Sequence, residues 1–311
     1  MNKSIKFLSI LLFSLCLLFN PLISEAKIQS FSFKFNGYKR SYHVYAPENI
    51  NPEFKYPLLL VLHGGGGTAL KMRKLTKYGF EKLADSKKFI VVYPQGVDKH
   101  WNDYRGDKLR KAKKENIDDV AFIREVIKKV ALQFPTDNKK IFTTGMSNGA
   151  MMSFTLACKA SDIIKGAAPV AGAMPENLVK KCKPINPVSI LMINGYQDKF
   201  VHWEGGYVTG PLGRKKFGKT ISVEESFNFW RKVNSCKEKS GSFTSLNKIE
   251  DDTQVEISKY KCAKSSKTIL YGIKGGGHTW PQGAKYLPGF LIGKTSQEFN
   301  TCEIIWDFFN P

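Results

Sequence analysis

The chain has 311 residues, of which 42% are hydrophobic and 13% aromatic. This composition excludes a disordered chain, a collagen-like repeat and a small disulfide-stapled scaffold. The formal charge is +21, from 48 basic and 27 acidic residues, and only seven of the basic residues are arginine. A nucleic-acid reader more often clusters arginine with aromatic residues, whereas the lysines here are scattered, so we expect no nucleic-acid partner. We interpret the charge mainly as a solvated basic surface, with attraction to an acidic surface or polymer as the alternative.

The first 26 residues have the layout of a secretory signal peptide. Two lysines precede an apolar run over 7–19, and small residues lead to Ala26. The run is too short to span a bilayer as a helix. Cys16 suggests a lipoprotein, but Leu15 stands where a small residue is needed. We expect cleavage after Ala26 and an exported mature chain, 27–311, in the periplasm or outside the cell, with no membrane partner. Two lysines and one glutamate leave with the leader, so the net charge becomes +20.

Five cysteines remain after cleavage, in a compartment where disulfides persist. Sequence proximity pairs Cys158 with Cys182 and Cys236 with Cys262, and leaves Cys302 free. Cys302 stands at the start of an amphipathic helical pattern, which favours a buried, inert thiol over a reactive one. No Cys-x-x-Cys or His-x-x-x-His spacing occurs, so we expect no metal and no cofactor.

Strand and helix patterns alternate along the chain. Alternating apolar residues around Asn36-Gly37 predict an opening hairpin. Continuous apolar runs, which are typical of buried parallel strands, cover 58–62, 89–93, 141–144, 167–171, 188–193 and 268–273. Helical patterns occur near 75–84, 149–159, 223–233 and 296–309, and the clearest one starts at a cap formed by Asp118 or Asp119.

This alternation predicts an α/β fold with a doubly wound, mostly parallel sheet. No linker or composition break separates a second domain, so we expect 27–311 to be a single domain. Residues 204–219 are rich in Gly and Lys and are interpreted as a long surface loop. Residues 237–261 are interpreted as a polar excursion.

A Gly-x-Ser-x-Gly pentapeptide, residues 145–149, lies between a predicted buried strand and an apolar helix. This is the context of a nucleophile elbow, in which the two glycines allow a sharp turn that exposes the serine. We therefore predict Ser147 as a nucleophile. The alternative is a glycine-rich turn with an idle serine.

A second motif, His63 followed by four glycines, comes directly after the predicted strand 58–62. Bare glycines let backbone N–H groups face a developing oxyanion, and the Lys-Ser/Thr of a phosphate-binding P-loop is missing. We expect the N–H groups of Gly65 and Asn148 to form an oxyanion hole. His63 is interpreted as a structural residue rather than a base. The other histidines with no supporting context are His43, His100 and His202.

A third motif, 275–281, places His278 on a glycine-rich loop after the predicted strand 268–273. Asp198 follows the predicted strand 188–193, so the order is Ser147, Asp198, His278, each just beyond the carboxyl end of a strand. We predict His278 as the general base and Asp198 as the acid that orients it. A loop histidine without a role and a surface carboxylate are the alternatives.

Seven motifs together resemble the secreted polyhydroxybutyrate depolymerase/feruloyl esterase family of α/β-hydrolases. They are H-G-G-G-G-T, W-N-D-Y-R-G, D-D-V-A-F-I, G-M-S-N-G-A-M-M, A-P-V-A-G, E-G-G and G-G-G-H-T-W-P. The likeness covers about 31–309 and implies an α/β-hydrolase fold with Ser147, Asp198 and His278 as the catalytic triad. It also suggests Trp101 and Trp280 as walls of the substrate pocket, with core packing as the alternative. Members of the family often carry paired cysteines.

The chain departs from the family pattern near the acid. It has N-G-Y-Q-D-K where the family tends to have H-G-T-x-D, and Gln282 shifts a common proline. Tyr196 and Gln197 therefore suggest an altered pocket around a retained aspartate. The chain ends at Pro311 without an appended polymer-binding module, which favours soluble esters or acyl groups on polysaccharides over solid polyester.

The leading hypothesis is a secreted serine carboxylic-ester hydrolase that acts on small-molecule or oligomeric esters. A serine peptidase on the same fold is the second hypothesis, although no anchor for a substrate amine is identified. The third is a non-catalytic binding protein that uses its basic surface to hold an anionic polymer. The sequence leaves the oligomeric state open.

Overall fold

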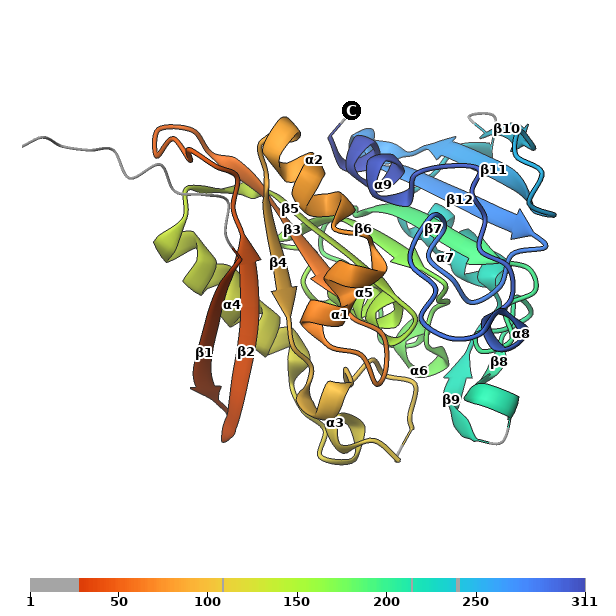
Figure 1. The fold of residues 1–311 in the computed structure, drawn as a ribbon, viewed down its shortest axis with the longest axis horizontal. Helices are drawn as coiled ribbons and strands as arrows, with labels where there is room; N and C mark the ends of the chain where they lie inside the picture. Colours follow the sequence, from red (N-terminus) through yellow and green to blue (C-terminus); the bar gives the residue numbers. More distant parts are fainter. Residues whose placement is uncertain (1–27, 108, 214, 239–240, 311) are drawn as a thin grey trace, which may run out of the picture.

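The computed structural model describes residues 28–107, 109–213, 215–238 and 241–310. The predicted signal peptide, 1–26, lies outside these residues. The described chain forms a large twisted sheet with helices on both faces, and β1 and β10 stand at its two ends (Figure 1). The strands of this sheet are β1 (Gln29–Phe35), β2 (Tyr38–Tyr45), β3 (Tyr56–Leu62), β4 (Ile90–Pro94), β5 (Thr136–Met146), β6 (Ile164–Val170), β7 (Ser189–Gly195), β12 (Lys267–Lys274), β11 (Gln254–Lys261) and β10 (Gly241–Leu246).

The strand order is β1-β2-β4-β3-β5-β6-β7-β12-β11-β10. The six central strands, from β4 to β12, pair in parallel, and each corresponds to a predicted apolar run. The opening hairpin is also confirmed, because Phe35 pairs with Tyr38 across Asn36 and Gly37, whose φ angles are 45° and 82°. Positive φ at both turn residues suits the twist of an antiparallel pair. The predicted mostly parallel sheet is therefore confirmed.

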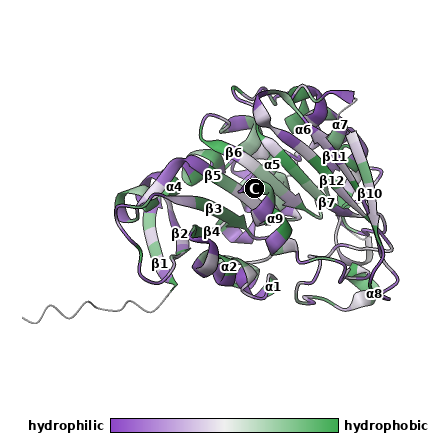
Figure 2. Ribbon diagram, turned by 90° about the horizontal axis from the view of Figure 1, so that it is seen from above, coloured by the Kyte–Doolittle hydropathy of each residue, from purple (hydrophilic) through white to green (hydrophobic). Residues whose placement is uncertain are grey.

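Two hydrophobic cores lie on opposite faces of the sheet. In β3, Leu58, Leu60 and Leu62 pack into one core, while Leu59 and Val61 pack into the other, as side-chain alternation along a strand requires. Apolar residues accordingly dominate β3 and β7 in Figure 2. The first core is covered by α4 (Asp119–Gln133), α5 (Asn148–Lys159) and α7 (Val223–Val233), and the second by α1 (Ala69–Leu75), α2 (Gly79–Lys87) and α9 (Thr301–Phe309).

The helix boundaries follow local capping chemistry. Of the two predicted caps of α4, Asp118 is the one whose side chain accepts a hydrogen bond from the N–H of Ala121. The helix predicted near 75–84 corresponds to α2, but it begins only at Gly79, because Lys77 and Tyr78 have positive φ and form a turn after α1. The remaining short helices are α3 (Lys111–Lys114), α6 (Glu176–Val179) and α8 (Gly289–Ile292).

Two segments predicted as irregular contain strands. In the first, 204–219, β8 (Gly206–Thr209) pairs with β9 (Lys216–Thr220), which ends one residue beyond it, as a separate antiparallel hairpin. Within 237–261, β10 and β11 extend the main sheet antiparallel to β12. In β11, Val255 and Ile257 face the core while the intervening side chains stay accessible. This half-buried edge carries too few apolar residues to be recognised from sequence hydropathy.

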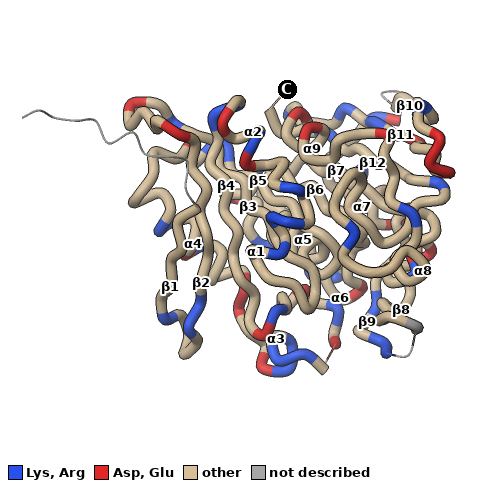
Figure 3. The backbone as a smooth tube through the Cα atoms, viewed as in Figure 1, with Lys and Arg blue, Asp and Glu red and all other residues tan. Residues whose placement is uncertain are grey.

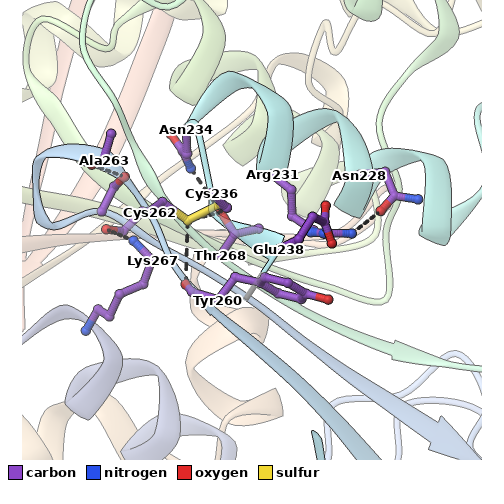
Figure 4. Close-up of a disulfide and its surroundings, with 12 residues drawn as sticks. Asn228, Arg231, Asn234, Cys236, Glu238, Tyr260, Cys262, Ala263, Lys267 and Thr268 are labelled. Atoms are coloured by element: carbon purple, nitrogen blue, oxygen red, sulfur yellow. Dashed lines mark hydrogen bonds and ion pairs between the residues drawn. A yellow bond between two sulfur atoms is a disulfide. The ribbon is translucent and has the colours of Figure 1, made fainter. Parts of the chain in front are cut away.

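Both predicted disulfides are present, Cys158–Cys182 and Cys236–Cys262. The second joins the end of α7 to the end of β11, and the hydroxyl of Thr268 lies 3.5 Å from both sulfurs (Figure 4). Cys302 is free and buried in α9, as expected. In the part of the chain that the structure describes, no helix is both long and apolar enough to cross a membrane.

Candidate functional site

The serine motif forms a strained turn between β5 and α5. Ser147 has φ 58° and ψ −116°, a conformation that residues other than glycine rarely adopt. Its N–H donates to the carbonyl of Val170 at 3.0 Å. A Cβ on Gly149 would lie 2.3 Å from the carbonyl oxygen of Leu62 in β3, so only glycine allows this approach. The two neighbouring strands therefore fix Ser147 at the carboxyl end of β5.

His278 and Asp198 lie side by side, although 80 residues separate them. Nδ1 of His278 is 2.6 Å from Oδ2 of Asp198, and the other carboxylate oxygen accepts the N–H groups of Phe200 and Val201 at 2.8 Å. Both side chains are almost fully buried. A Cβ on Gly195 would lie 2.3 Å from the carbonyl oxygen of Gly276, so the two loops approach closely because glycine occupies this position. The carboxylate fixes Nδ1 as the donor and leaves Nε2 as the nitrogen available for proton transfer.

Ser147 and His278 line one cavity of about 400 Å³, which is in the range of small-molecule sites. Asp198 lies behind His278, outside the lining. The structure thus brings together the three residues predicted from three separate strand ends. Apolar side chains supply part of the wall, namely Met72, Leu75, Phe200, Val208 and Leu287.

The glycine loop after β3 also borders this cavity. The N–H of Gly66 donates to the carbonyl of Lys99 at 2.9 Å, and that of Gly67 to the carbonyl of Gly64 at 3.0 Å. By contrast, within the described residues the N–H groups of Gly65 and Asn148 donate to no protein acceptor. Both residues line the cavity, so these two donors are free for a ligand.

The His63 side chain anchors this glycine loop through hydrogen bonds. Its Nδ1 is 2.8 Å from the carbonyl oxygen of Gly64, and its Nε2 accepts the N–H of Gly96 at 3.0 Å and the amide of Gln95 at 3.1 Å. Burial lowers the pKa of His63 to about 4, because desolvation disfavours the charged ring. Both ring nitrogens are engaged, which agrees with a structural role.

The side chain of Asn148 organises the W-N-D segment. Its Oδ1 accepts the N–H of Trp101 at 2.8 Å, and its Nδ2 donates to the carbonyl of Trp101 at 3.1 Å and to Oδ2 of Asp103 at 2.6 Å. Asp103 also pairs with Arg105 at 2.8 Å and Lys113 at 2.9 Å. Burial alone raises the pKa of this carboxyl, but the two cations more than offset it and hold the pKa below its usual range. The sequence predicted a role only for the backbone N–H of Asn148. The W-N-D motif was the sequence feature that could have indicated the contacts of its side chain with Trp101 and Asp103.

The tryptophans predicted as pocket walls lie in the core. Trp101 is fully buried, and its indole N–H donates to the carbonyl of His63 at 2.9 Å. Trp280 packs edge-on against Phe80, with ring centroids 6.0 Å apart. Neither lines the cavity, so the alternative of core packing describes both. Tyr196 also stays out of the cavity and stacks on Trp203 at 3.7 Å.

Sequence reasoning missed several polar residues of the cavity. His100, Arg105 and Arg110 lie on its wall, and so does Tyr286, whose hydroxyl donates to the carbonyl of His278 at 2.9 Å. Isolated residues in loops carry no pattern from which their convergence can be predicted. Across the described ranges, no group of three His, Cys, Asp or Glu side chains is arranged to hold a metal ion.

Comparison with known proteins gives consistent results. Residues 40–174 match the family described as Esterase PHB depolymerase. The chain is 28% identical over 289 residues to NocK of Nocardia uniformis subsp. tsuyamanensis, a protein named as an esterase, with 88% of this chain and 79% of that protein covered. It is 25% identical over 260 residues to feruloyl esterase D of Neurospora crassa, covering 80% and 77% of the two chains. It is also 34% identical over 167 residues to feruloyl esterase B of Piromyces equi, which covers 52% of this chain but 29% of that protein.

Solved structures support the fold. An acetyl xylan esterase from Aspergillus awamori superposes with a TM-score of 0.59 and 15% identity, covering 91% of this chain and 98% of that chain. A thermostable esterase superposes with a TM-score of 0.51 and 20% identity, covering 66% and 52%. Both likenesses concern the fold alone, and they confirm the predicted α/β-hydrolase architecture.

Proposed function

We propose that the chain, whose residues 40–174 match the Esterase PHB depolymerase family, is a serine carboxylic-ester hydrolase of that family with a Ser147, His278, Asp198 triad. Residues 27–311 then act as one catalytic domain. The observation that carries the proposal is that Ser147, on its strained turn, lines the same cavity as His278, whose Nδ1 is held by Asp198. Carboxylic ester hydrolysis is the activity class of the family.

In the proposed reaction, Oγ of Ser147 attacks the ester carbonyl carbon while Nε2 of His278 takes its proton. Asp198 holds the resulting imidazolium through Nδ1. The tetrahedral intermediate collapses as His278 gives the proton to the departing alcohol oxygen, which leaves an acyl-enzyme. Water then attacks the acyl carbon while His278 takes its proton. The second tetrahedral intermediate collapses as His278 gives this proton to Oγ of Ser147, which releases the carboxylic acid product and frees the serine.

The free N–H groups of Gly65 and Asn148 are proposed to bind the oxyanion of each tetrahedral intermediate. Their lack of a protein acceptor supports this role. Preorganised donors of this kind stabilise charge that develops only in the transition state, and losing one typically costs about 10²–10³ in rate. The Asn148 side chain, anchored on Trp101 and Asp103, fixes the position of its own N–H.

The proposed substrates are small or oligomeric esters, including acyl groups carried on polysaccharides. The names of the relatives, which include feruloyl and acetylxylan esterases, support this class. A cavity of about 400 Å³ has room for acyl groups larger than acetyl. Comparing kcat/KM for acetyl, butyryl, hydroxybutyryl and feruloyl esters tests which acyl group the enzyme prefers.

We also propose that residues 1–26 are removed and that the mature protein is exported. The two disulfides support an oxidising compartment. Intact mass of the protein recovered from each cell fraction tests this, and a full-length cytosolic product with reduced cysteines would contradict it.

The first test of the triad is intact mass after exposure to a fluorophosphonate. Attack by Ser147 displaces fluoride, so the mature protein should gain one adduct and the Ser147→Ala variant none. A folded protein without an adduct would instead favour a basic binding protein. Comparable kcat/KM for matched ester and amide substrates would favour a peptidase.

A further inference from the structure

The charged side chains on the cavity wall are mostly basic. They are Lys71, Arg105 and Arg110, against a single acid, Asp107. Oδ2 of Asp107 lies 3.8 Å from Nζ of Lys113, a cation just behind the wall. The charge of Asp107 is therefore neutralised by a lysine outside the cavity, and the uncompensated charge on the wall is positive.

Arg105 does not account for this excess. Its Nε is 2.8 Å from Asp103, which also binds Lys113 at 2.9 Å. Together with Asp107 these residues form a buried cluster of two cations and two carboxylates, whose net charge is zero. The excess positive charge of the cavity consequently lies on the remaining basic residues.

Arg110 is the best placed of these. In the described part of the chain, neither Arg110 nor Lys71 has a carboxylate at ion-pair distance. The Arg110 side chain is half-buried, and the centre of its guanidinium lies 4.7 Å from the ring centroid of Phe217 in β9. Phe217 also lines the cavity. This stacking holds the guanidinium at the wall and leaves its N–H groups free for an anion.

His100 lies on the cavity wall beside Gly65, one of the proposed oxyanion donors. A Cβ on Gly65 would be 3.3 Å from the His100 ring, whose Nδ1 is 2.7 Å from the carbonyl oxygen of Asp98. Burial lowers the pKa of His100, and the positive charges of Arg110 and Lys113 lower it further. The charge of Arg110 therefore acts on the part of the cavity wall where His100 lies beside Gly65.

The same basic and aromatic character continues outside the cavity. On the β8–β9 hairpin, the ammonium groups of Lys216 and Lys219 lie 4.7 Å and 4.9 Å from the centroid of the Tyr207 ring. Figure 3 shows basic residues on this hairpin, on α1 and on α3, with some acidic residues also near α3. Residues of α1 and of this hairpin also line the cavity, so these basic residues lie on elements that border it.

Building on the proposed esterase function, we propose that the cavity selects esters that carry a carboxylate near the scissile bond, and that Arg110 binds this carboxylate. A guanidinium pairs with a carboxylate through two parallel hydrogen bonds, which gives geometric selectivity as well as attraction. The carboxylate belongs to either the acyl group or the alcohol.

Two matched substrate pairs separate these two sources. For the acyl side, mono(4-nitrophenyl) adipate is compared with 4-nitrophenyl hexanoate, and for the alcohol side, 4-acetoxybenzoate with 4-acetoxybenzamide. We expect the anionic member of one pair to have a kcat/KM higher by about tenfold, the size of a hydrogen bond to a charged group. Ratios at or below one for both pairs would overturn the proposal.

Substitution distinguishes local recognition from the overall positive field. Arg110→Gln should abolish the preference, and Arg110→Lys should keep part of it. Lys114→Gln removes the same charge from α3, the helix that follows Arg110, but at an exposed position outside the cavity, so it should leave the ratio unchanged. Equal decreases in R110Q and K114Q would mean long-range steering and would contradict a site at Arg110.

A binding measurement separates this proposal from the catalytic one. In the Ser147→Ala variant, calorimetry with monomethyl adipate and methyl hexanoate should show tighter binding of the anion, and adding Arg110→Gln should remove the difference. This readout requires no turnover. A protein that hydrolyses no ester but keeps the Arg110-dependent preference would refute the esterase function alone, while equal affinities would refute the carboxylate site alone.

Discussion

His63 couples the stability of the protein to pH. As a neutral ring it donates from Nδ1 to Gly64 and accepts at Nε2 from Gly96 and Gln95. A proton on Nε2 would face these two N–H donors in a site that is 1% exposed. We therefore predict that acidification destabilises the fold at the glycine loop that borders the cavity.

The magnitude follows from the two pKa values of His63. Its ordinary pKa is 6.5, and burial lowers it to about 4 in the folded protein. Between these values only the unfolded chain binds the proton, so the free energy of unfolding falls by about 1.4 kcal/mol per pH unit. The contribution is fully present above pH 6.5 and is lost as the pH falls toward 4. About 2 kcal/mol should be lost by pH 5, and about 3 kcal/mol by pH 4.

Urea unfolding at pH 7, 6 and 5, with the disulfides intact, measures this loss. His63→Gln should be less stable at pH 7, but its stability should fall by about 2 kcal/mol less than that of the wild type between pH 7 and 5. His202→Gln, at an exposed position, should behave as the wild type. His43 and His100 also have lowered pKa values, but they are unchanged in all three proteins and cancel. Parallel pH profiles of wild type and His63→Gln would refute the reasoning.

Two further predictions concern buried groups. Asp103→Asn leaves Arg105 and Lys113 buried without their shared carboxylate, so it should lower the free energy of unfolding by about 3–5 kcal/mol. It should also reduce kcat/KM, because Asn148 loses the carboxylate that holds its side chain. A loss below about 1 kcal/mol in urea unfolding would contradict this prediction. Burial raises the pKa of the Cys302 thiol, so a thiol reagent should modify it only after unfolding, and rapid modification of the native protein would show the site to be open.

The fold and the proposed triad were predictable because each rests on local sequence. Continuous apolar runs marked the parallel strands, and the motifs around Ser147 and His278 follow directly after two of them. The parallel arrangement then brings these strand ends to one edge of the sheet. Asp198 follows the same rule, although its turn departs from the family pattern.

The polar network around the cavity was not predictable, because its partners come from distant segments. Asn148 binds Trp101 across 47 residues and Asp103 across 45. Each residue alone resembles an ordinary loop or helix residue. Hydropathy and spacing report what one segment does, whereas such a cluster depends on how two segments meet.

Asp118 and Asp119, two adjacent carboxylates at the start of α4, show which details the local sequence pattern leaves open. Either Asp118 or Asp119 satisfied the pattern of a cap, and the structure gives them different roles. Asp118 caps the helix, while Asp119 is buried and binds Arg40 at 2.6 Å and the N–H of Asn102 at 2.8 Å. A difference of one residue rotates a side chain by about 100° around a helix, which separates a solvent-facing cap from a buried ion pair.

The net charge of the chain leaves a similar detail open. A sum of +21 does not distinguish surface lysines from an arginine such as Arg110, which faces the cavity without a carboxylate partner among the described residues.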